Sequence, residues 1–164
     1  MATSSIYLGK IIESLYKKDN NTNFISEIKI SEEYSDGTFK VPLKVYGTAF
    51  RAGKHKGIVY SKKEVDFPKE SLNKKFCDLD HDNKERGNIE LAEHKEGKVM
   101  YTAVIKDPEI AKDIYNGKIK YVSPKINSKR CFIDGETYAK ELEFIGLSFL
   151  KNKNPGSEGT TVLI

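Results

Sequence analysis

The sequence predicts an α+β fold that is mainly an antiparallel β-barrel flanked by a few helices. Three observations support this prediction. Segments that alternate apolar and polar residues recur from the middle of the chain onward, several of the turns between them contain glycine, and only two or three segments have helical periodicity. A split βαβ layer is the alternative architecture.

The chain opens with a predicted helix. Leu8, Ile11, Ile12 and Leu15 follow the i, i+3, i+4, i+7 spacing of one apolar helical face, and a polar run from Asp19 to Asn23 ends the pattern. We therefore divide the chain into an N-terminal helical arm (1–23), a barrel domain (24–150) and a flexible C-terminal tail (151–164).

The first half of the barrel domain begins with a strand over residues 39–46, in which Pro42 indicates a sheet edge or a bulge. A glycine-bounded loop follows at residues 53–57, and a short helix is expected within residues 69–76. Residues 88–94 and 98–106 then form a predicted hairpin around Lys95-Glu96-Gly97.

The second half contains a helix with clear boundaries. Asp107 is suited to the N-cap, Pro108 to the first helical position and Gly117 to the C-terminal stop. A strand over residues 119–126 follows. The last predicted hairpin joins residues 129–133 to residues 137–150 through Asp134-Gly135, a dipeptide favoured in two-residue turns.

Composition limits the function classes. The chain has 164 residues, and its 28 basic residues are interspersed with 24 acidic ones, which indicates a solvated surface rather than the concentrated charge of a nucleic-acid binder. Its longest uncharged apolar run near the C-terminus, Phe144 to Leu150, is far shorter than the roughly 20 residues of a membrane span. Lys10 interrupts the first apolar stretch, so we expect no secretory signal and two reduced cysteines, Cys77 and Cys131.

Of the three histidines, His81 has the most distinctive surroundings. His55 lies in a Lys/Gly loop and His94 on a polar strand face, so both are predicted to be solvated. His81 follows Cys77-Asp78-Leu79-Asp80 and precedes Asp82, which suits either a general base or an ordinary salt-bridged histidine.

The acidic cluster around His81 does not have the spacing of a metal site. A calcium loop beginning at Asp78 needs glycine at its sixth position and glutamate at its twelfth, where the chain has Asn83 and Ile89. Cys77 and His81 have no second pair at zinc-ligand spacing. We therefore expect no metal and no other cofactor.

Ser123 is the second candidate residue. On strand parity it shares the inward face with Ile119 and Tyr121, and Pro124 follows it directly. A hydroxyl in this place either bonds to neighbouring backbone or serves as a nucleophile held by a restricted chain. A serine nucleophile needs a nearby base because its hydroxyl is a weak nucleophile at neutral pH.

Together these residues carry a resemblance. Four segments follow one another along the chain: Gly47-Thr48-Ala49-Phe50; Asp80-His81-Asp82; the helix–Gly–strand block from Ile110 to Lys125, which contains Ser123-Pro124; and Leu142 to Phe149, which precedes Asn154-Pro155. About two thirds of the chain, from Val45 to Pro155, resembles the capsid maturation (prohead) serine proteases of tailed phages, which share a clan with the herpesvirus assemblins.

The resemblance implies a herpesvirus-protease-like barrel with Ser123 as nucleophile and His81 as general base. The third member would be a His or a carboxylate on the strand after the nucleophile, where this chain has Glu141 and Glu143. We favour Glu143, flanked by Leu142 and Phe144, as the more buried of the two. A His–Ser dyad without a third member stays open, and a loop bearing Lys151 or Arg130 is a candidate source of oxyanion donors.

The implied activity is endoproteolysis of scaffold and capsid-precursor proteins, and of the protease's own ends, inside an assembling prohead in the host cytoplasm. The resemblance requires no nucleic acid and no membrane, and it leaves a homodimer or higher oligomer open. The competing hypotheses are a non-catalytic viral structural or scaffold-binding barrel, and a nucleic-acid-binding barrel that uses exposed tyrosines such as Tyr46.

Overall fold

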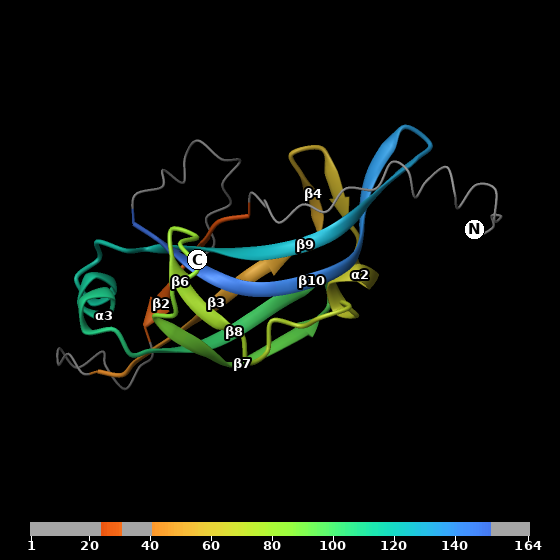
Figure 1. Cartoon of the computed structure of the whole chain (residues 1–164). Coiled ribbons are helices and arrows are strands. Elements are labelled where there is room, and N and C mark those ends of the chain that lie inside the picture. The colour runs from red at the N-terminus through yellow and green to blue at the C-terminus, as the bar shows by residue number, and fades with distance from the viewer. Residues whose placement is uncertain (1–23, 31–40, 152–164) are drawn as a thin grey trace.

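The computed structural model describes residues 24–30 and 41–151, and the predicted helical arm and the tail beyond Lys151 lie outside these ranges. Figure 1 shows one curved sheet with a helix at each end. Its strands are β1 (Ser26–Glu27), β2 (Lys29–Ile30), β3 (Leu43–Arg51), β4 (Gly53–His55), β5 (Ile58–Tyr60), β6 (Phe76–Leu79), β7 (Gly87–Lys95), β8 (Lys98–Ile105), β9 (Tyr121–Ile133) and β10 (Glu136–Leu150).

The sheet curls into a nearly closed barrel because its two ends are consecutive in the chain. The strand order is β1-β9-β10-β6-β7-β8-β3-β2, with β4 and β5 attached beside β10. Only Ile28 separates β1 from β2, and its N–H donates to the Lys120 carbonyl at 2.7 Å. The predicted barrel flanked by a few helices is therefore confirmed. Most pairings are antiparallel, but β10 runs parallel to both β5 and β6.

The strand predictions are correct in type and less accurate in extent. In β3, Leu43 and Val45 are buried while Tyr46 is exposed, as alternation requires, but the strand starts after Pro42 and continues to Arg51. The expected loop at 53–57 is instead the β4–β5 hairpin. The predicted strand at 119–126 and the first arm of the last hairpin are one continuous strand, β9.

Two helices flank the barrel. The eight-residue α3 (Pro108–Tyr115) matches its prediction: the Asp107 side chain accepts hydrogen bonds from the N–H groups of Glu109 and Ile110, and Pro108 occupies the first turn. The short α2 (Lys62–Asp66) begins after Ser61, whereas residues 69–76 contain no helix, so that prediction was wrong. Neither of these helices is long enough to cross a membrane.

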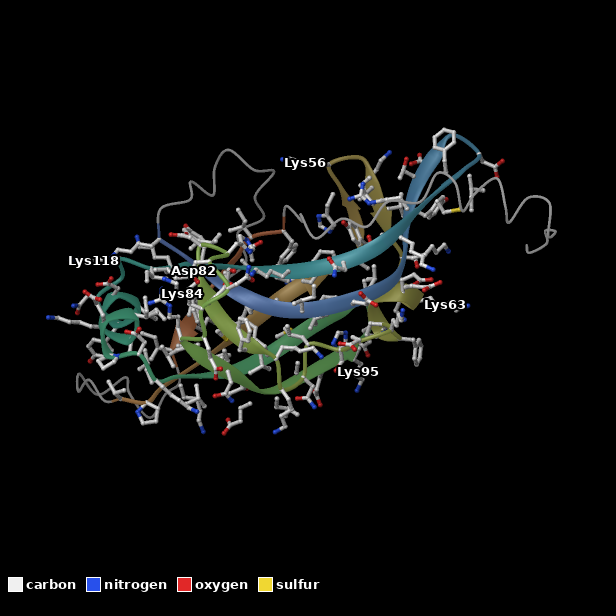
Figure 2. All side chains as sticks on the ribbon, in the orientation of Figure 1. Lys56, Lys63, Asp82, Lys84, Lys95 and Lys118 are labelled. Carbon is white, nitrogen blue, oxygen red and sulfur yellow. The ribbon has the colours of Figure 1, made fainter. Side chains whose placement is uncertain are left out.

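One hydrophobic core fills the barrel. Its largest fully buried side chains come from β3, β7, β8, β9 and β10 and from segments next to strands: Phe24, Phe50, Phe144, Phe149, Leu43, Leu72, Ile89, Ile105, Ile119, Ile126, Leu142 and Leu147. Charged side chains project from many elements, as the lysines labelled in Figure 2 show for the β4–β5 turn (Lys56), α2 (Lys63) and the end of β7 (Lys95). This distribution fits the solvated surface expected from the interspersed charges.

Candidate active site

The candidate site is a row of polar side chains across three adjacent strands. Ser148 of β10 pairs in register with Ser123 of β9 on one side and with Asp78 of β6 on the other. Residues directly opposite each other in neighbouring strands present their side chains on the same face of the sheet. All three are almost completely buried, with Ser123 3%, Ser148 0% and Asp78 1% exposed.

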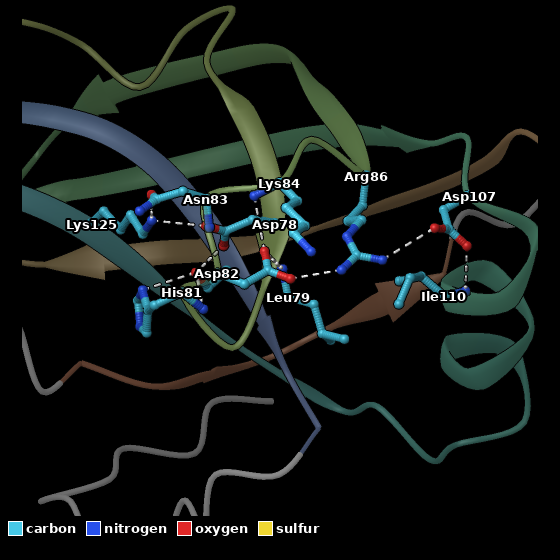
Figure 3. Close-up of polar contacts among 11 residues, drawn as sticks. Asp78, Leu79, His81, Asp82, Asn83, Lys84, Arg86, Asp107, Ile110 and Lys125 are labelled. Carbon is cyan, nitrogen blue, oxygen red and sulfur yellow. Dashed lines mark hydrogen bonds and ion pairs between the residues drawn. The ribbon is translucent and has the colours of Figure 1, made fainter.

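His81 approaches this row from a tight turn after β6. The turn starts at Asp80, whose N–H donates to the Phe149 carbonyl at 2.8 Å, and both Asp80 and His81 have positive φ angles, 49° and 60°. L-residues rarely adopt such angles. The turn reverses the chain direction directly after β6 and brings the His81 imidazole (Figure 3) to Ser148 of β10.

The Ser148 hydroxyl connects His81 to Asp78. Its oxygen lies 2.9 Å from His81 Nδ1, accepts the backbone N–H of His81 at 3.2 Å, and donates to Asp78 Oδ1. A sequence separation of 67 residues lies between Ser148 and His81, so only the folded sheet brings them together.

Asp78 is held by further donors from two other elements. Its Oδ2 lies 2.8 Å from Lys125 Nζ and accepts the Asn83 backbone N–H at 2.8 Å. Lys125 Nζ also donates to the Asn83 side-chain oxygen. Lys125 lies two residues after Ser123 on β9, which puts both side chains on the same face of the strand. The site therefore combines two hydroxyls, an imidazole and a buried ion pair.

An ionic chain anchors the His81 turn to α3. Arg86 lies 2.6 Å from Asp82 and 3.4 Å from Asp107, the N-cap of the helix (Figure 3). Burial raises the pKa of Asp82, but the hydrogen bonds from the Lys84 N–H and the Arg86 guanidinium outweigh that effect and hold the pKa below its ordinary value. The carboxylate thus stays ionised and keeps the turn fixed at neutral pH.

The structure brings together two of the three residues predicted from sequence. Ser123 is the cross-strand partner of Ser148, which His81 contacts directly. Glu143 lies elsewhere: it is five residues before Ser148 on β10, it pairs with Asn127, and its carboxylate is 3.2 Å from Lys69. It is more buried than Glu141, as expected, but the carboxylate that reaches the imidazole's hydrogen-bond network belongs to Asp78.

The expected oxyanion donors differ in their placement. Arg130 pairs with Ala139 near the far end of the hairpin, seven residues from Ser123, or roughly 23 Å along an extended strand. Lys151 lies near the site: its N–H donates to Asp80 Oδ1 at 2.9 Å, and its ammonium is 2.8 Å from Asp113. This hydrogen bond lowers the pKa of Asp113.

The other two histidines are structural, contrary to the prediction that they are solvated. His55 packs against the rings of Phe24, Phe50 and Tyr60. His94 accepts the Leu72 N–H at 3.1 Å, and its Nδ1 is 2.9 Å from the Val65 carbonyl. Burial lowers the pKa of both rings. Period-two alternation could not reveal these roles, because the partners come from separate segments.

Sequence reasoning missed Asp78, Lys125 and Ser148 as members of the site. The sequence marks Asp78 as one of the carboxylates around His81, Lys125 as the end of the Ile110–Lys125 block, and Ser148 as a residue of the last strand, and it assigns none of them a role in the site. A signal was present for Ser148, since a hydroxyl flanked by Leu147 and Phe149 needs a partner when it is buried. Within residues 24–30 and 41–151, no group of His, Cys, Asp and Glu side chains is arranged to hold a metal ion.

Comparisons with known proteins found similarity among solved structures alone. No protein-family model matches the chain, and no curated protein matches it. Among solved structures, the chain is similar to the capsid assembly protease gp21 of bacteriophage T4, with 15% sequence identity and a TM-score of 0.47 over 82% of this chain and 94% of that one. The function proposed below is therefore based on the geometry of the site.

Proposed function

We propose that this protein is a serine endopeptidase of capsid maturation, with Ser123 as nucleophile and His81 as general base. The observation that carries the proposal is the contact of His81 Nδ1 with Ser148, the residue that sits directly opposite Ser123 in the sheet. This arrangement brings an imidazole to the hydroxyl row although 42 residues separate His81 from Ser123.

In the proposed reaction the Ser123 oxygen attacks the carbonyl carbon of the scissile peptide bond. The hydroxyl proton passes to His81, which then returns it to the leaving amine as the carbon–nitrogen bond breaks. Water attacks the resulting ester, again losing a proton to His81, and releases the carboxylic acid product and the free serine. Donors for the oxyanion are needed near Ser123, and the segment at Lys151 is the nearer of the two predicted sources.

The substrates follow from the sequence resemblance described above. They are scaffold protein, capsid precursor and the protease's own ends, cleaved inside the assembling prohead. Burial of Ser123 has a mechanistic consequence. Because Ser123 is only 3% exposed, the proposal requires a rearrangement that opens its hydroxyl to a peptide.

The test uses a fluorophosphonate probe that modifies activated serines, followed by mapping of the labelled peptide. We expect modification at Ser123, and we expect Ser123→Ala and His81→Ala each to abolish both labelling and cleavage of a co-expressed capsid precursor, a loss on the order of 10⁶ in turnover. Ser128→Ala is the matched control, because Ser128 is also a buried β9 serine and its hydroxyl has no hydrogen-bond partner among the described residues. Full cleavage by either active-site variant would refute the proposal.

The same burial favours a second candidate function. A non-catalytic capsid or scaffold-binding barrel has no need to expose Ser123, and it would use the buried polar row only to fix strand register. This alternative predicts no probe labelling at any serine and unchanged capsid assembly in the Ser123→Ala variant. A single labelling experiment therefore separates the two functions.

A further inference from the structure

We propose that Ser148 and Asp78 are positioning residues that fix the tautomer of His81, in the place that the sequence suggested for Glu143. The inference rests on the proposed peptidase function and identifies how its general base is oriented. It follows from counting protons in the hydrogen bonds around one hydroxyl.

The Ser148 hydroxyl has a single hydrogen and two lone pairs. An ionised carboxylate accepts hydrogen bonds and donates none, so in the contact with Asp78 Oδ1 the hydrogen must come from Ser148. The two lone pairs then accept the His81 backbone N–H at 3.2 Å and the His81 ring nitrogen Nδ1 at 2.9 Å. His81 Nδ1 is consequently the protonated nitrogen, and Nε2 carries the basic lone pair of the neutral ring.

This assignment excludes Ser148 as the nucleophile and keeps Ser123 in that role. Both lone pairs of the Ser148 oxygen accept hydrogen bonds from His81, so neither is available to attack a carbonyl carbon. Ser123 occupies the adjacent strand at the same register. The Nε2 lone pair is the one that a serine nucleophile requires from its base.

Asp78 keeps its accepting role because two donors hold its other oxygen. Lys125 Nζ and the Asn83 N–H both lie 2.8 Å from Oδ2, and the ammonium supplies the opposite charge. Because the ionised carboxylate only accepts hydrogen bonds, the Ser148 hydrogen points to Asp78 Oδ1. Lys125 and Asn83 therefore orient Asp78. Asp78 in turn orients the Ser148 hydroxyl, which contacts the His81 ring.

Glu143 is badly placed for this task. It lies five residues from Ser148 along β10, roughly 16 Å in an extended strand, and its carboxylate pairs with Lys69. Glu143→Gln therefore provides a direct comparison with the proposed positioning residues.

The experiment measures the rate of fluorophosphonate labelling at Ser123 and the protonation of the His81 ring by 15N NMR. In the unmodified protein we expect His81 to carry its proton on Nδ1. Ser148→Ala should move the proton toward Nε2 and lower the maximal labelling rate by roughly 10²- to 10⁴-fold, with little change in the probe concentration that gives half that rate. Ser128→Ala, a buried serine variant outside the row, should change neither quantity.

The outcomes separate this inference from the proposed function. If Ser123→Ala and His81→Ala abolish labelling while Ser148→Ala leaves both the rate and the tautomer unchanged, the positioning role is wrong and the peptidase stands. The same conclusion holds if Glu143→Gln, and not Ser148→Ala, removes activity. Labelling at Ser148 itself would overturn the positioning role and the choice of nucleophile together, and no labelling of the unmodified protein would remove the peptidase.

Discussion

Replacing Lys125 by methionine should destabilise the protein strongly, because it leaves a buried carboxylate without its counter-ion. The side chains of Lys125 and Asp78 are 9% and 1% exposed, and their charged atoms are 2.8 Å apart. Removal of one partner from such a buried pair costs about 3–5 kcal/mol. For a protein of this size, about 2–4 °C per kcal/mol converts that loss to a drop in Tm of roughly 6–20 °C.

The assay is urea unfolding followed by circular dichroism, with Lys54→Met as the matched control. Lys54 forms the same kind of ion pair with Glu136, but its side chain is 56% exposed and that of Glu136 is 43% exposed, so its loss should cost less than about 1 kcal/mol. The double variant Asp78→Asn with Lys125→Met should recover part of the lost stability. If Lys125→Met costs no more than Lys54→Met, the reasoning about the buried pair is wrong.

Three further predictions concern other parts of the barrel. Burial lowers the pKa of His94, so at acidic pH the folded state binds fewer protons than the unfolded chain. The contribution of His94 to the free energy of unfolding should therefore be constant above the unfolded pKa of about 6.5 and should fall as the pH drops below it. His94→Gln should flatten this pH dependence in urea titrations between pH 8 and pH 5. Asp107→Ala removes the cap of α3 and a contact of Arg86, and should lower the free energy of unfolding by about 1 kcal/mol, whereas an unchanged value would contradict the capping geometry. Gly146→Ala places a methyl group 2.9 Å from the Phe76 carbonyl oxygen, so it should force β6 and β10 apart. The expected cost is about 1–3 kcal/mol of unfolding free energy, measured as a lower urea midpoint. An unchanged midpoint would show that the two strands are not so close.

Local signals predicted the elements better than the site. Asp107 and Pro108 fixed the start of α3, and Asp134 and Gly135, with φ angles of 50° and 82°, form the last hairpin turn as expected. These features depend on neighbours in the chain, which the sequence displays. The misplaced helix at 69–76 fell on residues that instead pair with β10: the Glu70 N–H donates to Leu142, and its carbonyl accepts from Phe144.

The candidate site depends on pairings that no local pattern encodes. Ser123 and His81 became candidates because their immediate neighbours, Pro124 and the flanking aspartates, are unusual. Glu143 was favoured over Glu141 for its apolar neighbours Leu142 and Phe144, and those neighbours correctly predicted its greater burial. They could not show that the parallel pairing of β6 with β10 would put Asp78 beside Ser148. That information resides in strand order, which the sequence leaves open.

The central position of β10 also sets when the polar row can form during protein synthesis. This strand comes last among the described elements, yet it lies between β6 and β9 and carries the hydroxyl that both flanking strands need. A growing chain that stops before Ser148 contains His81 and Ser123 but lacks the hydroxyl that lies between them. The topology thus delays assembly of the row until β10, the last of the described strands, has been synthesised.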